Sequence, residues 1–597
     1  LYDNQGAVLN TSAPGADRYR IRLSLIDESD IASSESFIFL AELQNGGVVR
    51  SVNAADPFNV PQQIVAQRIK ENSGDYLIKQ FTGKFEEDSA NTHLLLKMSD
   101  GVAVIDGFRV SRGPSAIRVS KSTNVYSRDG QVVPAAFGNF VKVSSAEGAT
   151  NGLPNIGTFE QLDIQDSADF HGGSTAKLGT ARVRAISEDG ANYRYHLFDI
   201  KLDANKSFRN AKSIGSDSNN WFNITLENSI AVLNETQNNN LLFALPGDRP
   251  ANIDDIRLTT QRFEGNVSVG PTADGSKAVG SLTTLSGSET FTNSGDWVIA
   301  KNDSALFTGL RSIEDSIGPG AGATQAKFFL DSAANGTYEA AYYVRNTAGT
   351  IRTKTLETNV TKLYISPSSN DSADSDGNGL ISLGTDKTDL FRLIEVKDSA
   401  SGLQDYSSRF TFDNGQRDNF YDEGRLILKS GQSLPTGKIF IKFDHFSHNA
   451  TGNFFALNSY DSDALGGYKN IPTHTLDNGT IISLSDVLDF RPVKNPLDGT
   501  FVGGISRINE LPQPNDFIEF DAEYYLQQSG KIVLTNEGKI EFIEGDNGAP
   551  AISFPEAPVG TMGLYNVILG ANTLTDSDLT IQPIDHKRFT MKDIARL

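Results

Sequence analysis

The chain has 597 residues, of which 38% are hydrophobic and 21% are charged, so the sequence predicts several packed globular domains rather than a disordered chain. Its net charge of −21 opposes nucleic acid and anionic membrane surfaces as general partners. The absence of cysteine excludes disulfide scaffolds, thiolate nucleophiles and cysteine-bound metal centres, and no apolar run approaches the ~20 residues that cross a bilayer, so we expect no membrane insertion.

Short runs that alternate between apolar and polar residues dominate the chain and predict β-strands. Tyr19–Leu25 and Lys438–Phe443 alternate cleanly. Asn-Gly and Asp-Gly pairs, which favour tight hairpins, mark many turns, for example at Asp189 and Asn414. The predicted fold class is therefore all-β and multidomain, with β-sandwich or immunoglobulin-like units and a short helix that starts at the C-terminus.

Two segments have helical features. Pro61–Glu71 begins with a proline that suits a first helical turn, and Ser73 and Gly74 follow it as a stop signal. A second helix is predicted to begin at Thr590, because an acidic residue follows at the capping-box spacing and three apolar residues share one face. The chain stops after about two turns of this helix, so we expect the natural polypeptide to continue.

The domain boundaries are predicted near residues 118, 240, 366 and 475. They give an N-terminal β-domain (1–118), a β-sandwich (119–240), an immunoglobulin-like sandwich (241–365), a further β-domain (366–475) and a C-terminal β-domain that leads into a helix (476–597).

The sharpest local motif resembles the first part of a calcium loop. Oxygen-bearing side chains stand at alternate positions and a glycine follows at the sixth, so the predicted ligands are Asp374, Asp376, Asn378, Leu380 and Ser382. The bidentate glutamate expected at position twelve is Thr385, which removes two coordinating oxygens. The alternative is a plain Asp/Gly/Asn turn in a solvated linker. The predicted cofactor is therefore none or Ca²⁺.

Three histidines form a weaker candidate metal site. His445 and His448 have a spacing seen in some metal sites, and His474 lies downstream. Residues three apart in a strand point to opposite faces, so packing or surface positions are the favoured interpretation.

Glu519, Asp521 and Glu523 form an acidic row along one face of a predicted strand. A glycosidase needs two carboxylates that face each other across a sugar, and a row along one strand implies no opposing wall. A solvated face, or pairing with Lys and Arg of a neighbouring strand, is favoured. No other catalytic motif is present, so we expect that the chain is not an enzyme and carries no catalytic residues.

Several colinear stretches resemble large virion structural proteins of tailed phages, especially the tail or baseplate proteins of contractile-tailed phages of cyanobacteria. They are Leu1–Asn4, Ala13–Ala16, Tyr19–Leu25, Phe39–Leu43, Glu71–Tyr76, Gly101–Phe108, Phe412–Asp422 with Gly424–Arg425, Asp489–Pro492, Phe520–Leu526, Lys531–Leu534 and Asp585–Ile594. The region from about 119 to 400 departs from this pattern and looks like inserted β-domains.

The resemblance implies a structural component of a virion tail or baseplate that acts through interfaces with copies of itself and with other tail proteins. The central domains would then be exposed and face a host-surface glycan or receptor. Phe420 and Tyr421 are candidate interface anchors, and Arg425 can pair with a carboxylate. The alternative is a strand with a packed Phe–Tyr pair, and Arg417 with Asp418 would then form an internal ion pair.

Two other functions stay open. Zero cysteine, the acidic charge and the calcium-like loop are compatible with a secreted bacterial adhesin or a calcium-dependent surface protein. A tail-borne enzyme that degrades glycans would need opposed carboxylates in a groove.

Overall fold

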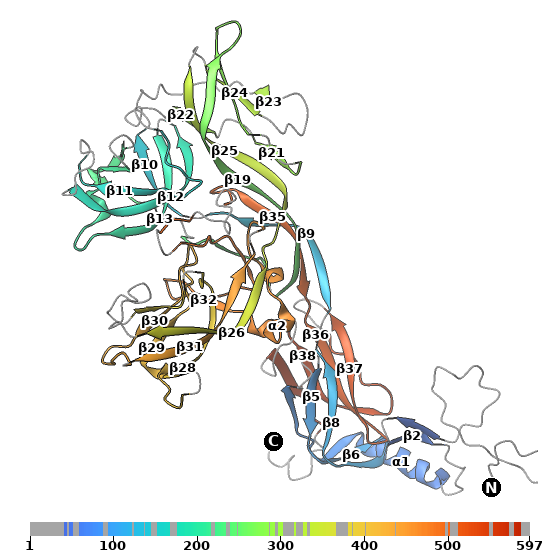
Figure 1. Ribbon diagram of the computed structural model, residues 1–597. Coiled ribbons are helices and arrows are strands. Elements are labelled where there is room, and N and C mark those ends of the chain that lie inside the picture. Colours follow the sequence, from blue (N-terminus) through green and yellow to red (C-terminus); the bar gives the residue numbers. More distant parts are fainter. Residues whose placement is uncertain are drawn as a thin grey trace, which may run out of the picture. The chain divides into compact units, whose positions relative to one another are not determined.

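The computed structural model describes residues 41–44, 47–51, 59–365 and 380–586, with gaps inside the last two ranges. The gaps are 88–92, 122–123, 137, 145–151, 168–175, 191, 217–220, 235–238, 248, 284, 286, 293–296, 302–315, 318–325, 331–334, 385, 400–401, 436, 450, 496–498, 502–510, 548–552 and 572–577. The described residues are mostly β-strand and form many small sheets, so the prediction of a multidomain all-β fold is confirmed (Figure 1).

The chain divides into two compact units. The first comprises Leu1–Ile78, Ala103–Val110 and His586–Leu597, and the second comprises Lys79–Val102 and Ser111–Asp585.

The first unit contains the helix α1 (Asn59–Ser73), which confirms the helix predicted over Pro61–Glu71. Gly74 ends the helix with a φ of +61°, and its N–H donates to the carbonyl of Lys70 at 2.8 Å. No helix among the described residues is long and apolar enough to cross a membrane.

The helix packs through its smallest apolar side chain. Ala66 is buried, whereas Ile64 and Val65 are more than half exposed. A Cβ on Gly107 would lie 1.9 Å from the carbonyl oxygen of Ala66, so glycine is required where this turn approaches the helix. Two small sheets include residues of this unit, with strands β1 (Ala41–Gln44) and β2 (Gly47–Ser51), and in the order β3-β6-β7 strands β3 (Tyr76–Lys79), β6 (Gly101–Ile105) and β7 (Phe108–Arg112).

The second unit contains a six-stranded antiparallel sheet in the order β10-β13-β12-β11-β14-β15. Its strands are β10 (Asn139–Ser144), β11 (Gln161–Gln165), β12 (Lys177–Asp189), β13 (Asn192–Leu202), β14 (Ser213–Gly215) and β15 (Trp221–Asn223). Their inward apolar side chains form one core with Val298, Ala300 and Ala341 of a neighbouring sheet.

The neighbouring sheet has nine strands and is organised by β19, which is 22 residues long. Figure 1 shows β19 beside the long strand β25. β35 pairs with the other end of β19, antiparallel to it. The strands are β9 (Val125–Pro134), β19 (Pro250–Pro271), β20 (Ala278–Ser281), β21 (Glu289–Phe291), β22 (Val298–Lys301), β23 (Ser316–Ile317), β24 (Ala326–Leu330), β25 (Gly336–Gly349) and β35 (Phe517–Tyr525).

The acidic row lies on β35, and two of its three residues pair with arginines of the adjoining strands, as one of the two favoured interpretations predicts. Glu519 lies 3.2 Å from Arg257 of β19 and 3.0 Å from Arg345 of β25. Asp521 lies 3.1 Å from Arg257 and also accepts the N–H of Gly130 of β9 at 2.7 Å. These two carboxylates therefore connect β35 to β9, β19 and β25.

Four small sheets surround the candidate site described below. They are β26 (Lys354–Ile365), β31 (Lys438–His448) and β28 (Leu390–Lys397); β27 (Leu380–Ser382), β30 (Arg425–Leu428) and β29 (Phe410–Asp413); β18 (Leu242–Ala244) with β34 (Val487–Asp489); and β32 (Thr473–Thr475) with β33 (Ile481–Ser483). The short helix α2 (Ser462–Leu465) lies between β31 and β32 in sequence.

Two of the remaining sheets of the second unit come from the ends of the chain, and one two-stranded sheet comes from its middle. They are β37 (Ile540–Asn547), β36 (Gln528–Thr535), β38 (Thr561–Leu569) and β39 (Leu579–Pro583); β4 (Gly83–Glu87), β5 (His93–Met98) and β8 (Ser115–Ser120); and β16 (Leu226–Glu227) with β17 (Ile230–Ala231).

Several strand pairs join segments that the predicted domain boundaries separate. β35 pairs with both β9 and β19, and β26 pairs with β31. The five domain limits and the immunoglobulin-like character of residues 119–365 stay predictions. The strand at Tyr19–Leu25 and the helix from Thr590 lie outside the described residues.

Candidate functional site

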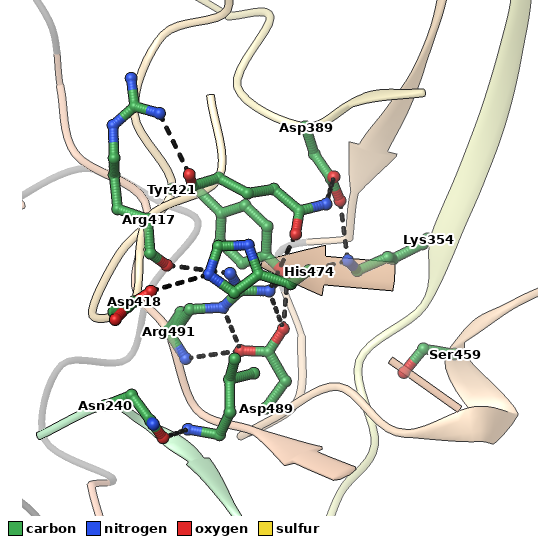
Figure 2. A network of polar contacts seen from close by, with 12 residues as sticks. Asn240, Lys354, Asp389, Arg417, Asp418, Tyr421, Ser459, His474, Asp489 and Arg491 are labelled. Atoms are coloured by element: carbon green, nitrogen blue, oxygen red, sulfur yellow. Dashed lines mark hydrogen bonds and ion pairs between the residues drawn. The ribbon is translucent and has the colours of Figure 1, made fainter. Parts of the chain in front are cut away.

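Two ion pairs are buried close together in the second unit, and Figure 2 shows the side chains that join them. Lys354 Nζ lies 2.7 Å from Asp389 Oδ2, and neither side chain has exposed surface. Arg491 Nη2 lies 2.8 Å from Asp489 Oδ2, with side-chain exposures of 0% and 2%. Buried charges are costly unless they are paired and fully hydrogen-bonded, so the surroundings of these four groups decide whether the fold tolerates them.

Strand ends place three of the four charges. Lys354 is the first residue of β26, Asp389 directly precedes β28, and Asp489 is the last residue of β34. In the ladder between β26 and β31, Lys354 lies opposite His448. The backbone pairing of these strands therefore places the three charged side chains in the interior.

Tyr421 connects the two ion pairs. Its hydroxyl oxygen accepts from Lys354 Nζ at 2.9 Å and from Arg491 Nη2 at 3.0 Å, and its proton is donated to Asp489 Oδ2. The Arg491 guanidinium also lies over the ring, 4.3 Å from its centroid. One phenol therefore bonds to both cations and to one of the carboxylates.

Gln416 and His448 complete the hydrogen bonds of Asp389. Gln416 Nε2 donates to Asp389 Oδ1 at 2.8 Å, while its amide oxygen accepts from Arg491 at 3.3 Å. His448 Nε2 lies 2.9 Å from Asp389 Oδ2. We term the connected set the charge network: Lys354, Asp389, Gln416, Tyr421, His448, Asp489 and Arg491.

An aromatic cage encloses the Lys354 ammonium group. The ring centroids of Phe455, Tyr421, Tyr460 and Phe446 lie 4.6, 4.8, 5.0 and 5.8 Å from Nζ. The Tyr460 hydroxyl also accepts from Nζ at 3.1 Å. These contacts replace the water that Lys354 loses on burial.

Burial and neighbouring charges shift the pKa values of the network in defined directions. Burial lowers the pKa of Lys354, and it lowers that of His448 to about 4, so the imidazole is neutral at pH 7. Burial opposes ionisation of Asp389 and Asp489, but the adjacent cations outweigh it and hold the pKa of each carboxyl below its usual range. In its ionised form the network has two cations and two anions, and its net charge is zero.

The residue types of the network also occur in catalytic sites. Here, however, the charged groups and the tyrosine hydroxyl form hydrogen bonds to one another. The lysine, the tyrosine and both carboxylates are fully or almost fully buried, and each bonds to at least two other members. The arrangement therefore cross-links five chain segments, those of β26, β28, β31 and β34 and the loop that carries Gln416 and Tyr421.

A partly exposed layer of charges adjoins the network. Arg417 binds both oxygens of Asp413, at 2.8 and 2.7 Å, and Asp418 pairs with His474 at 2.9 Å. The internal ion pair expected between Arg417 and Asp418 is therefore wrong. Each of the two residues finds its partner elsewhere, in Asp413 and His474.

The candidate interface residues lie at different depths. Phe420 is 9% exposed, and Tyr421 is fully buried in the charge network. Both rings therefore pack against side chains of their own chain, and a role of Phe420, Tyr421 and Arg425 at an interface stays a prediction. Arg425 is partly exposed and lies 3.5 Å from Glu423 and 3.8 Å from Asp422.

The calcium-like loop lies mostly outside the described residues, namely at Asp374, Asp376 and Asn378. Of its predicted ligands the structure describes Leu380 and Ser382 at the two ends of β27. Ser382 is buried and its hydroxyl donates to Glu423. Calcium binding at this loop stays a prediction.

The three histidines do not meet. His448 bonds to Asp389 and His474 to Asp418, while burial lowers the pKa of His445. Within the part of the chain that the structure describes, no three His, Asp or Glu side chains are grouped to hold a metal ion.

Sequence reasoning missed Lys354, Asp389 and Arg491 as site residues. A usable signal is present at one place: Asp489 and Arg491 flank Phe490 directly after an apolar strand, and residues two apart point to the same face. No motif marks Lys354 or Asp389: Lys354 stands between two threonines, and Asp389 stands between Thr388 and Leu390, as charged residues at strand ends commonly do.

Comparison with known proteins gives one match. The family described as a domain of unknown function, DUF4815, matches residues 1–133, less than a quarter of the chain. No curated protein and no solved structure matches.

Breaking one buried ion pair is expected to destabilise the second unit strongly. Asp389→Asn leaves the Lys354 ammonium group buried without its counter-charge, so we expect the free energy of unfolding to fall by about 3–5 kcal/mol. Urea denaturation followed by the fluorescence of Trp221 and Trp297 measures it. Asp100→Asn, at an exposed pair with Lys79, is the control and should cost far less. Equal effects of the two substitutions would contradict a stabilising network.

Stability is expected to fall as the pH drops from 6.5 toward 4. The unfolded chain protonates His448 near 6.5 and the folded chain only near 4, so the unfolded state binds more protons in this window. The loss is at most about 3 kcal/mol. His448→Gln keeps a donor to Asp389 but does not titrate, so urea midpoints at pH 7 and 5 should differ less in this variant. Burial of His445 adds a change of the same sign, so some pH dependence should persist. An unchanged pH dependence in His448→Gln would be evidence against the assignment.

Gly415 is expected to be essential for the loop that carries Gln416. Its φ is +78°, and an added Cβ would lie 2.4 Å from the carbonyl oxygen of Asp422. Gly431 has a φ of +80° with open space around it, so Gly431→Ala pays only the backbone strain. Melting temperatures should therefore fall much further for Gly415→Ala than for Gly431→Ala.

Proposed function

We propose that the chain is a structural component of the tail or baseplate of a tailed phage, and that it acts through interfaces with other tail proteins and with copies of itself. The resemblance of both ends of the chain to such proteins motivates the proposal. The described fold is compatible with it, because it consists of many β-sheets, and the nine-stranded sheet joins strands from distant parts of the chain.

One observation carries the proposal: the charged groups of the two buried ion pairs take their hydrogen bonds from side chains of the same chain. Lys354, Asp389 and Asp489 are buried and fully hydrogen-bonded, as a cross-link requires. A catalytic group must instead contact its substrate and keep a bonding position free for it. This favours a structural role over turnover of a substrate.

The acidic row supports the same conclusion. Glu519 and Asp521 are the carboxylates that a glycan-degrading enzyme would use on β35, yet both are held by arginines of the same sheet. Carboxylates that bind arginine in this way link neighbouring strands of the sheet.

An antibody raised against the chain is expected to label the tails of purified phage particles in negative-stain electron microscopy. The chain should also co-sediment with tails after particles are disrupted, and the recombinant chain should sediment as an oligomer. Serum from before immunisation is the control for labelling.

Labelling of bacterial envelopes without particles would contradict the proposal and favour the adhesin. Release of sugars from capsular polysaccharide by the purified chain would favour the glycan-degrading enzyme.

A further inference from the structure

A second group of buried polar atoms lies outside the charge network, where residues 152–160 meet strand β25. The N–H of Leu153 donates to Glu339 Oε2, and the N–H of Asn155 donates to Glu160 Oε2 at 2.7 Å. Amides two residues apart lie within ~7 Å of each other. Two carboxylates are therefore gathered on one short segment, although they are 179 residues apart in sequence (339 − 160).

The lack of a side chain at Gly152 leaves room for the Glu339 carboxylate. Gly152 is the first residue of the 152–160 segment, and a Cβ on it would lie 2.3 Å from Glu339 Oε2. Any other residue would therefore displace the carboxylate from its position.

The two carboxylates lack compensation by a basic group. In the described part of the chain neither Glu160 nor Glu339 forms an ion pair, in contrast to Glu519 and Asp521. Both carboxylates thus stand on one short segment with backbone amides as their partners, and a bound cation would compensate their charge.

Two further oxygen atoms at this place have no hydrogen-bond partner. Tyr195 is fully buried, and its hydroxyl is unpartnered; the side-chain oxygen of Asn155 is buried and unpartnered as well. Tyr195 packs in the same hydrophobic core as Leu153 and Ile156 of this segment and Ala341 of β25. Buried polar atoms without a partner are rare and indicate an ion or a water molecule.

We propose that Glu160, Glu339 and the side-chain oxygen of Asn155 bind a calcium ion, and that the Tyr195 hydroxyl bonds to water in its coordination shell. Calcium accepts six to eight oxygen ligands in irregular geometry, which water and backbone carbonyls can complete. An all-oxygen set does not suit zinc or copper. Because the protein supplies two carboxylates only, we expect a dissociation constant of about 0.1–1 mM.

The ion would connect two sheets. Glu160 directly precedes β11 of the six-stranded sheet, and Glu339 lies on β25 of the nine-stranded sheet. Leu153, Ile156 and Ala341 already share one hydrophobic core across this contact. Calcium would add a polar cross-link at its edge, in the way that Arg257 links β19 to β35.

Calorimetric titration of the whole chain with calcium chloride tests the proposal. All proteins carry Asp376→Asn, which disables the calcium-like loop predicted at Asp374–Ser382. The parent is expected to bind calcium and to melt a few degrees higher in calcium than in EDTA. Glu339→Gln should weaken binding at least about tenfold and lose the shift in melting temperature, yet melt no lower than the parent in EDTA, because it also removes the repulsion from Glu160.

Glu264→Gln is the matched control. Glu264 accepts the N–H of Thr283 at 3.0 Å and so performs the same backbone contact without a second carboxylate on that segment. This variant should bind calcium as the parent does. If the circular dichroism spectrum shows that Glu339→Gln is misfolded, Glu160→Gln decides by the same criteria.

Three outcomes would overturn the proposal: no calcium binding by the parent, equal binding by the parent and Glu339→Gln, or binding of magnesium as tight as that of calcium. The last result would reject calcium as the ion, because magnesium requires a tighter octahedral site.

Discussion

A charge that leaves water must find its compensation inside the protein, and this constraint organises the interior of the second unit. Lys354 and Arg491 are cations without exposed surface, and each is matched by a carboxylate that strand pairing places beside it. Since the partners come from segments as far apart as residues 354 and 491, satisfying one charge fixes the relative position of several strands. Apolar packing alone specifies such positions less strictly, because hydrophobic contacts have no direction.

The same constraint is met in different ways elsewhere. On β35, Glu519 and Asp521 are only partly buried, and arginines of neighbouring strands neutralise them at the sheet surface. Water shares the solvation there, so each pair contributes little by itself. At Glu160 and Glu339 the chain supplies backbone amides but no basic side chain, and the deficit is what points to an ion from solution. Burial and the available partners thus distinguish a cross-link, a surface pair and a candidate cation site.

Local patterns predicted the local structure well. Alternation predicted an all-β chain, and proline at one end with Ser73 and Gly74 at the other predicted α1. The charge network could not be predicted in this way, since neither Lys354 nor Asp389 belongs to a motif that marks a buried charge. Tyr421 shows most clearly what local sequence cannot predict. Its sequence neighbours suit a surface position as well as a core position. Only the long-range pairing of β26 with β31 and of β18 with β34 shows that the side chain is buried. Burial of a polar side chain is a property of its non-local partners.

The 22-residue strand β19 has a mechanical consequence. Its first third pairs with β35 and the rest pairs with β25, so one uninterrupted backbone passes through both pairings without an intervening loop. A pull along this backbone would act in shear on many hydrogen bonds at once, and those bonds would have to break together rather than in succession. Bending between the two regions would require curving a paired strand, which is stiffer than rotating about a hinge, so tension applied at one end would be transmitted to the other with little slack.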